Sequence, residues 1–243
     1  AAIQAGKDVA LANKETLVMA GEIMTREQRS RGTRLLPIDS EHCALHQCLV
    51  SRDPGGVSKL WLTASGGPFR TRPASTFGEI TVEEALNHPT WRMGRKISID
   101  SATLMNKALE IIEAHWLFGI PGDRIDVVVH PQSVVHSMVE FKDGTVLAQL
   151  GRTDMRIPIQ YALTYPEVWE TPLQPMDLGT AFSLGFEPPD HARFKSLGLA
   201  QEALARGGTT PAAMNAANEV AVQAFLDGEI PFPGITEIVS DVV

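Results

Sequence analysis

Short apolar runs that end in polar residues recur along this chain. The runs at 9–12 (VALA), 35–38 (LLPI) and 59–64 (KLWLTA) are too short for helices and have the composition of buried strands. The segment 96–100 (KISID) ends in the same way. Ligands collect at the carboxyl ends of strands in sheets built from strand–helix units, so the polar residues after these runs are the first candidates for a site. They are Lys14, Asp39, Ser40, Glu41, Ser65 and Ser101.

Helical spacing of apolar residues, together with start and stop residues, predicts the helices of the chain. The central one begins after Asp100 or Ser101, which are good N-caps, and ends at Gly119. A later one has Thr210 as its cap and Pro211 at its first helical position. The predicted helices cover 15–32, 42–49, 100–119, 195–206 and 210–227.

Consecutive strands without intervening helices follow the central helix. They are predicted at 126–130, 133–141 and 146–150. Asp143-Gly144 between the last two is a strong hairpin signal, so part of the sheet is antiparallel. Residues 164–190 are rich in proline and irregular, as in a linker. The chain is therefore predicted to be α/β, with a mixed sheet, a proline-rich linker and helices after it.

Composition and charge narrow the class of protein. The chain has 243 residues, 44% of them hydrophobic, and a net charge of −8. The acidic balance argues against binding nucleic acid, and no run of about 18 apolar residues is present to span a membrane. Two cysteines, Cys43 and Cys48, are too few for a disulfide framework and favour a reducing compartment. A cytoplasmic enzyme is the default expectation.

The two ends indicate the interior of a longer protein. The chain starts at Ala1 without an initiator methionine, and it closes on an apolar segment (ITEIVSDVV) without the residues that stop a helix. The natural N-terminus would then lie outside this sequence, so a targeting segment before Ala1, for a plastid for example, stays open.

Two closely spaced carboxylates raise the question of a metal. Asp39 and Glu41 would project from one face of an extended segment, and with a third carboxylate they would form an oxygen site typical of Mg²⁺ or Mn²⁺. The simpler alternative is a solvated strand end. On the following helix, Asn106, Lys107 and Glu110 share a polar stripe. That stripe supplies either the missing carboxylate or an ordinary solvated face.

The segment SGGPF at 65–69 is a candidate for binding an anion. Its glycines permit backbone conformations that present N–H groups to a phosphate, although an ordinary turn would have the same composition. The segment is not a P-loop, and Gly-x-Gly-x-x-Gly occurs nowhere in the chain.

The histidines are less informative. Two histidines and two cysteines at 42–48 match no usual zinc spacing, and on a helix they could not all face one metal. His130 and His136 lie in predicted strands and are expected to be structural. His88 is the strongest functional candidate, because it stands beside Pro89 in a predicted mobile loop.

Taken in order, a series of motifs closely resembles the 1-deoxy-D-xylulose 5-phosphate reductoisomerase family. The motifs are LANKETL, LPIDSEHCAL, TASGGPFR, HPTWRMGRKISIDSATLMNKALEIIEAHWLF, VVVHPQSVVHSMV and MNAANEVAVQAFL. They cover essentially the entire chain, and the stretch over 88–118 is highly specific. The resemblance implies an enzyme of non-mevalonate isoprenoid biosynthesis that uses NADPH and Mg²⁺, Mn²⁺ or Co²⁺. Its substrate would be 1-deoxy-D-xylulose 5-phosphate and its product 2-C-methyl-D-erythritol 4-phosphate.

The resemblance also assigns roles to residues. It implies that the metal is held by Asp39, Glu41 and Glu110. It implies that the substrate is bound by Lys14, Ser40, Glu41, Ser65, His88, Trp91, Ser101, Asn106, Lys107 and Glu110, the phosphate by Ser65, Ser101, Asn106 and Lys107. Asn13, Glu15 and Gly94 match positions near NADPH, and Trp91 and Met93 match a flexible lid near 85–95. The expected catalytic residues are Lys14, Glu41 and Glu110.

Domain boundaries follow from the same resemblance. We expect the end of a Rossmann-like NADPH-binding domain at 1–38, a catalytic and dimerisation domain at 39–164, a linker at 165–190 and the first part of a C-terminal helical domain at 191–243. The strands over 126–150 would form the sheet of a homodimer. Because the glycine-rich dinucleotide motif is missing, residues 1–243 alone are expected to be inactive. Two rival hypotheses are a metal-dependent sugar-phosphate aldolase or isomerase without a nicotinamide cofactor, and a non-catalytic oligomerisation or ligand-binding module.

Overall fold

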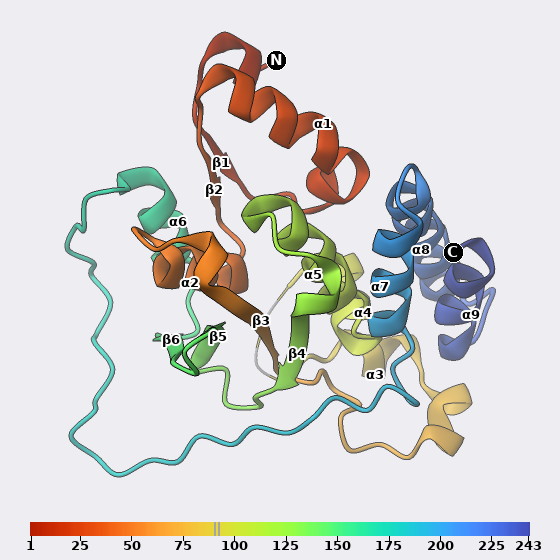
Figure 1. The fold of residues 1–243 in the computed structure, drawn as a ribbon. Coiled ribbons are helices and arrows are strands. Elements are labelled where there is room, and N and C mark those ends of the chain that lie inside the picture. The colour runs from red at the N-terminus through yellow and green to blue at the C-terminus, as the bar shows by residue number, and fades with distance from the viewer. Residues whose placement is uncertain (90, 92) are drawn as a thin grey trace.

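The computed structural model describes residues 1–89, 91 and 93–243 (Figure 1). The chain begins with a small unit in which β1 (Val9–Leu11) and β2 (Leu35–Pro37) pair in parallel. They are connected by α1 (Glu15–Arg31), which ends at Gly32 because this residue adopts a left-handed φ of 64°. The predicted helix and both strands are confirmed.

A mixed sheet forms the centre of the molecule. Among the described residues its strand order is β4-β3-β5-β6. Strand β3 (Val57–Ala64) is parallel to β4 (Ile125–Val129) and antiparallel to β5 (Val135–Phe141), which pairs with β6 (Val146–Leu150). The turn between β5 and β6 contains Gly144 at a φ of 84°, as its hairpin signal predicted. The mixed sheet and the hairpin are therefore confirmed.

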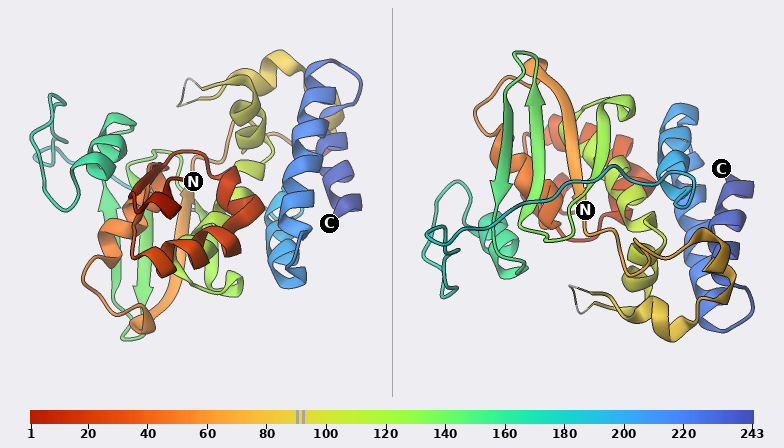
Figure 2. Two further views of the ribbon diagram at one scale, coloured as in Figure 1. Left: turned by 90° about the horizontal axis from the view of Figure 1, so that it is seen from above. Right: turned by 90° about the horizontal axis from the view of Figure 1, so that it is seen from below.

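Helices surround the sheet, as Figures 1 and 2 show. Helix α2 (Ser40–Leu49) packs on β5 and β6, and α5 (Met105–Phe118) packs on β3 and β4. On the other side of α5 stand α7 (Ser196–Arg206), α8 (Thr210–Leu226) and α9 (Phe232–Val242). The remaining helices among the described residues are α3 (Val82–Leu86), α4 (Arg95–Ala102) and α6 (Arg156–Thr164). Short 3₁₀ helices lie at Ile3–Ala5, Pro54–Gly56, Ala74–Glu79 and Gly122–Arg124.

The interpretation of 96–100 as a strand is wrong. These residues lie in α4, and the helix predicted to start at Asp100 or Ser101 starts at Met105. A break separates the two helices at Leu104, whose φ is 57°. The alternation of Ile97 and Ile99 with serine imitated a strand, but β3 already has β4 and β5 as neighbours. The strands that precede the candidate residues also belong to two sheets rather than one.

Helices α6 and α9, like α4, were not predicted as helices from the sequence. Helix α6 follows the mixed sheet and packs on α2, β1 and β2, and α9 follows the two predicted C-terminal helices. Between α6 and α7 the chain is irregular, as expected, and runs across the molecule as the long cyan segment of Figure 1. Its Glu187 forms an isolated antiparallel bridge with Val129, at the end of β4.

Candidate functional site

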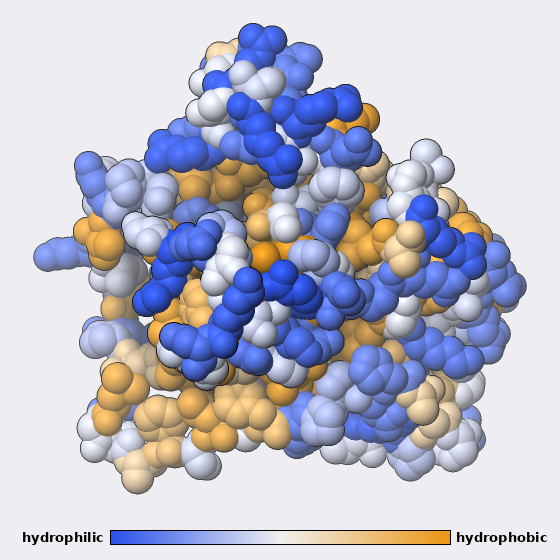
Figure 3. Space-filling model, viewed as in Figure 1, coloured by the Kyte–Doolittle hydropathy of each residue, from blue (hydrophilic) through white to orange (hydrophobic). Residues whose placement is uncertain are grey.

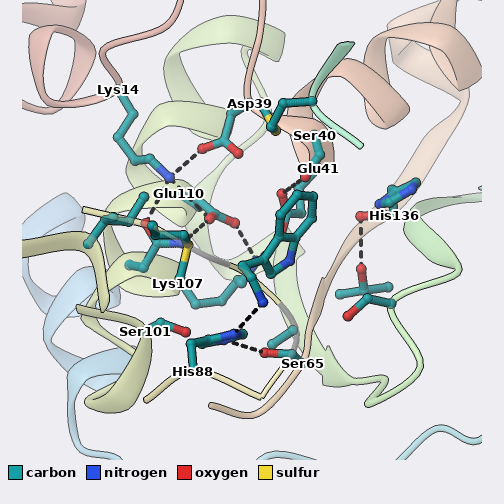
Figure 4. Close-up of a pocket in the computed structure, with 18 of the residues that line it drawn as sticks. Lys14, Asp39, Ser40, Glu41, Ser65, His88, Ser101, Lys107, Glu110 and His136 are labelled. Carbon is teal, nitrogen blue, oxygen red and sulfur yellow. Dashed lines mark hydrogen bonds and ion pairs between the residues drawn. The ribbon is translucent and has the colours of Figure 1, made fainter. Parts of the chain in front are cut away.

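One cavity of about 470 Å³ collects the polar residues that follow β1, β2 and β3, together with the start of α5 (Figure 4). Every residue predicted to bind metal or substrate lines it. The structure thus brings together Lys14, Asp39, Ser40, Glu41, Ser65, His88, Trp91, Ser101, Asn106, Lys107 and Glu110. Their individual roles stay predictions. Thr90 and Arg92 of the predicted lid lie outside the described residues.

Three carboxylates meet at one end of this cavity. Single oxygen atoms of Asp39, Glu41 and Glu110 lie within 4.8 Å of one another. Asp39 and Glu41 reach this point because β2 ends just before them and α2 begins at Ser40. Glu110 comes from the second turn of α5, which crosses the same end of the cavity. Three converging oxygen donors are a set that suits Mg²⁺ or Mn²⁺.

Two buried lysines form ion pairs with these carboxylates. The Lys14 ammonium contacts Asp39 and lies 3.1 Å from Glu110 Oε1. The Lys107 ammonium lies 2.7 Å from Glu41 Oε1 and 2.5 Å from Glu110 Oε2. Burial would lower the pKa of Lys14, but Asp39 and Glu110 outweigh that effect and raise it well above its usual value. Both lysines therefore carry charge, in the region that a divalent cation would share.

Glu110 is fully buried, unlike an acid on a solvated helix face. Burial raises its pKa to about 7, and the neighbouring Glu41 carboxylate adds to the rise. Asp39 differs: burial would raise its pKa too, but Lys14 and His42 hold it well below the usual range. The polar stripe on α5 is thus a buried face that meets the carboxylates of α2 and its N-cap, and the solvated alternative is wrong for it.

A second pair of buried groups lies behind the carboxylates. His42 Nδ1 is 3.2 Å from Glu113 Oε2, and its Nε2 is 2.9 Å from the main-chain oxygen of Glu110. That main-chain oxygen can only accept, so Nε2 carries a proton. Glu113 was missed from the sequence, although it continues the polar stripe of α5 three residues after Glu110.

The opposite end of the cavity presents hydroxyl groups. Ser65 Oγ lies 3.3 Å from His88 Nε2, and the Gly67 N–H donates to Ser65 Oγ over 3.3 Å. The Trp91 N–H donates to His88 Nδ1, so the proton of the neutral ring sits on Nε2 and points to Ser65. Ser101, in the last turn of α4, completes this end.

Gly67 connects the loop after β3 to α4. Its φ is 67°, and a Cβ atom added there would lie 2.6 Å from the main-chain oxygen of Ser101. Glycine is therefore required twice, for the left-handed backbone and for the close approach. This contact sets the distance between the loop that carries Ser65 and the helix that carries Ser101.

Residues predicted to lie near NADPH have partners in the structure. Asn13 Oδ1 accepts from the N–H and the hydroxyl of Thr16 at the start of α1. Glu15 lies 3.3 Å from the Lys96 ammonium, and Gly94 is the N-cap of α4. The cavity also has lining residues that the sequence did not indicate, among them Thr63, Ile97, Ser133, His136, Met155 and Ile159. None of them was assigned a role from the sequence, and Ser133 and Met155 lie outside the helices and strands.

Comparison with protein families is consistent across the chain. A model described as "1-deoxy-D-xylulose 5-phosphate reductoisomerase C-terminal domain" matches residues 35–118. One described as "DXP reductoisomerase C-terminal domain" matches residues 150–243, and one described as "1-deoxy-D-xylulose 5-phosphate reductoisomerase" matches residues 1–21. Three models of one enzyme thus match in chain order.

Curated relatives carry the same name. The 1-deoxy-D-xylulose 5-phosphate reductoisomerase of Symbiobacterium thermophilum is 61% identical over 243 residues, which are 100% of this chain and 62% of that protein. The enzyme of Chloroherpeton thalassium is 60% identical over 240 residues, 99% of this chain and 62% of that protein. The chain therefore spans about 62% of the length of these relatives.

Solved structures share the fold. The reductoisomerase of Zymomonas mobilis in complex with NADPH is 51% identical with a TM-score of 0.92, over 98% of this chain and 62% of that one. A DOX-P reductoisomerase in complex with NADPH, fosmidomycin and magnesium is 48% identical with a TM-score of 0.94, over 99% of this chain and 62% of that one. The chain belongs to the 1-deoxy-D-xylulose 5-phosphate reductoisomerase family.

Proposed function

We propose that this chain carries the metal and substrate site of an enzyme that converts 1-deoxy-D-xylulose 5-phosphate to 2-C-methyl-D-erythritol 4-phosphate with NADPH. One observation supports this most: three carboxylates and a pair of serines face each other across a single cavity. A phosphorylated sugar matches this arrangement, with its carbonyl group at the carboxylates and its phosphate at the serines. The rearranged carbon skeleton would be reduced as an aldehyde.

The carboxylates fit a divalent metal. Asp39, Glu41 and Glu110 supply only oxygen donors, and their charges exceed those of Lys14 and Lys107 by one when all five groups are ionised. We assign these three residues to Mg²⁺ or Mn²⁺, the former being present in the matched complex. When bound, such a metal polarises a carbonyl and stabilises developing oxyanions as a Lewis acid.

The remaining residues would bind and orient the substrate. We assign Ser65, Ser101 and the loop N–H groups to the phosphate, since they are hydrogen-bond donors at the end away from the carboxylates. Phosphate binding would act as a handle that orients the reacting end and favours closure of Trp91 and Met93 over the cavity. Lys14, beside the carboxylates, would add positive charge near a developing oxyanion.

We also assign Lys107 and Asn106 to the phosphate, on the condition that they first leave their present partners. In the structure the Lys107 ammonium bridges Glu41 and Glu110, and Asn106 Nδ2 donates to Glu110 Oε1 at 2.5 Å. A metal on these carboxylates would compete with both side chains for the same oxygen atoms. Lys107 and Asn106 would then be released toward the phosphate, which ties the two ends of the site together.

NADPH is the hydride donor in this proposal, as its presence in two matched complexes suggests. This chain would contribute the edge of the nicotinamide site through Asn13, Glu15 and Gly94. No glycine-rich dinucleotide motif occurs within residues 1–243. We therefore expect a polypeptide of residues 1–243 alone to show no oxidation of NADPH above background. The measurement is the absorbance of NADPH in the presence of the xylulose phosphate and Mn²⁺. Measurable turnover by that polypeptide would refute this expectation.

The proposal is tested on the full-length protein by following NADPH absorbance with 1-deoxy-D-xylulose 5-phosphate. We expect oxidation of NADPH with Mn²⁺ or Mg²⁺, its loss on treatment with EDTA, and its recovery when Mn²⁺ is returned in excess. Consumption of the sugar phosphate without oxidation of NADPH would instead support the aldolase or isomerase hypothesis.

The proposal includes a homodimer. Val146 and Leu150 of β6 are 49% and 40% exposed on the edge strand of the mixed sheet. Figure 3 shows apolar side chains gathered at the lower left, where β5, β6 and the chain after α6 lie in Figure 1. An open, apolar edge strand of this kind is usually covered by another surface, and a second copy of the chain would cover it.

Among the described residues no helix has the length and apolarity of a membrane span. We place the enzyme in a bacterial cytoplasm, in line with the bacterial relatives.

A further inference from the structure

Lys96 of α4 joins three segments of the chain through one ammonium group. Its Nζ lies 2.7 Å from Asp100 on the same helix, 3.3 Å from Glu15 in α1 and 3.1 Å from Glu219 in α8. Asp100 is 1% exposed, and its second oxygen accepts a hydrogen bond from Asn218 Nδ2 of α8 at 2.8 Å. Both oxygens of this buried carboxylate are therefore held, one from α4 and the other from α8.

Asn218 buries a polar side chain where an apolar one would pack with a lower desolvation cost. Asn218 is fully buried, and its side-chain oxygen has no hydrogen-bond partner among the described residues. An apolar residue of similar size would fill the space without an unsatisfied polar atom. Asparagine is useful here only because its N–H group holds Asp100 at a fixed place. The hydrogen bond from Asn218 therefore links the position of α4 to that of α8.

Helix α4 presents two different faces. Lys96 and Asp100, four residues apart, face α1 and α8. Ile97 and Ser101 follow each of them by one residue and line the cavity. Because α4 is a rigid element, a rotation that broke the contact with Asn218 would also turn Ser101. Figure 1 shows α4 between the sheet side of the molecule and the C-terminal helices.

We propose that Asp100 and Asn218 are positioning residues for the phosphate end of the cavity, and that they hold α4 at the rotation in which Ser101 faces the loop of Ser65. This inference rests on the proposed function, which assigns the phosphate to that end. Neither side chain lines the cavity, so both act through α4. Through them, the C-terminal helices take part in recognising a phosphate that they do not touch.

The test compares four variants of the full-length protein with the wild type. They are Asn218→Leu, the exchange Asp100→Asn/Asn218→Asp, Ser101→Ala as the reference for a lost phosphate ligand, and Gln223→Ala as a control. Gln223 lies on the exposed side of α8, where it donates to Asp227 over 2.8 Å. Three quantities are measured: the Kd of inorganic phosphate by calorimetry, the Kd of Mn²⁺ by electron paramagnetic resonance, and the melting temperature. Phosphate is the probe because it reports on one end of the cavity, and Mn²⁺ reports on the other.

For Asn218→Leu we expect a 10- to 100-fold weaker affinity for phosphate, since a turned α4 would lose the hydrogen bond from Ser101 to a charged oxygen. The Kd of Mn²⁺ should change by less than about threefold, because the carboxylates come from other elements. The exchange variant keeps the same atoms and one N–H···O contact, so it should recover most of the phosphate affinity. Gln223→Ala should match the wild type in all three quantities.

Several outcomes would overturn the proposal. If Asn218→Leu lowers only the melting temperature, the pair is structural; if it weakens phosphate and Mn²⁺ equally, the whole site has been disturbed. If Asn218→Leu does not fold, the exchange variant decides, and a phosphate affinity as poor as that of a Ser101→Ala variant refutes positioning. Failure of the proposed function is recognised separately, by a wild type that binds phosphate but oxidises no NADPH with the xylulose phosphate.

Discussion

Glu110→Gln in the full-length protein is expected to abolish metal-dependent oxidation of NADPH without lowering the melting temperature of the metal-free protein. The substitution keeps the size of the side chain and removes one negative charge and one ligand from the carboxylate group. Three carboxylates against two ammonium groups leave one negative charge, so the variant presents a cation with none. Loss of a partner outside the ligand set already costs about 10- to 100-fold in affinity. We therefore expect Mn²⁺ to bind at least about 100-fold more weakly.

The expected stability of this variant follows from the sign of a pKa shift. Burial raises the pKa of Glu110 from its usual 4.5 to about 7, so the ionised form is less favourable in the folded state than in the unfolded one. Such a carboxylate destabilises the fold progressively above pH 4.5, and the effect is complete above about pH 7. A neutral amide does not have this cost. At pH 7.5 the metal-free variant should melt at or above the temperature of the wild type.

The control is Glu202→Gln, which removes the same charge at an exposed ion pair with Arg206 on α7. Pairs of this kind contribute about 0.3–0.5 kcal/mol, so activity and Mn²⁺ affinity should stay unchanged. Calorimetry with Mn²⁺ and the absorbance assay measure both quantities for each variant. A Glu110→Gln protein that binds Mn²⁺ as tightly as the wild type would remove Glu110 from the metal site. A large fall in its melting temperature would favour the non-catalytic hypothesis, in which these residues are structural.

The sequence predicted a site residue where local pattern fixes its place, and not where its place depends on contacts between distant elements. Asp39 and Glu41 follow a short apolar strand, so their place at a strand end could be predicted from local pattern alone. The burial of Glu110 and Lys107 could not, because it depends on α2 bringing Glu41 against α5. A polar stripe on a helix looks the same in sequence whether it meets water or other charges. The resemblance to a family resolved what local pattern left open.

The break between α4 and α5 shows where local pattern fails. The break falls at Thr103 and Leu104, and neither is a glycine or proline that would end a helix. Leu104 nevertheless adopts a left-handed φ of 57°. The hydroxyl of Ser196, at the start of α7, donates to the main-chain oxygen of Thr103 over 2.9 Å and satisfies a group that the break leaves open. That partner lies 93 residues away in the sequence. Likewise, Asp100 has the residue type of an N-cap, but it lies inside α4 and accepts a hydrogen bond from Asn218 of α8. The sequence around Asp100 does not contain that partner.

Gly67→Ala is expected to weaken phosphate binding about 10- to 100-fold while leaving Mn²⁺ binding nearly unchanged. The new Cβ would lie 2.6 Å from the main-chain oxygen of Ser101, and neither the loop nor α4 can absorb that overlap by turning a side chain. The loop and the helix must therefore separate, which moves Ser65 away from Ser101. A hydrogen bond to a charged group contributes about 1.5–3 kcal/mol, so the loss of one serine donor weakens phosphate binding by about 10- to 100-fold. The left-handed φ of 67° adds about 1–3 kcal/mol of backbone strain.

Gly32→Ala separates these two effects. Gly32 has a nearly equal φ of 64°, but a Cβ there would meet no atom within 4 Å, and it ends α1 far along the chain from both serines. We expect this control to lose stability by backbone strain alone and to keep the phosphate affinity of the wild type. Calorimetry with inorganic phosphate and thermal melting of both full-length variants provide the comparison. If Gly67→Ala loses no more phosphate affinity than Gly32→Ala, the contact between Gly67 and Ser101 does not set the geometry of the phosphate end.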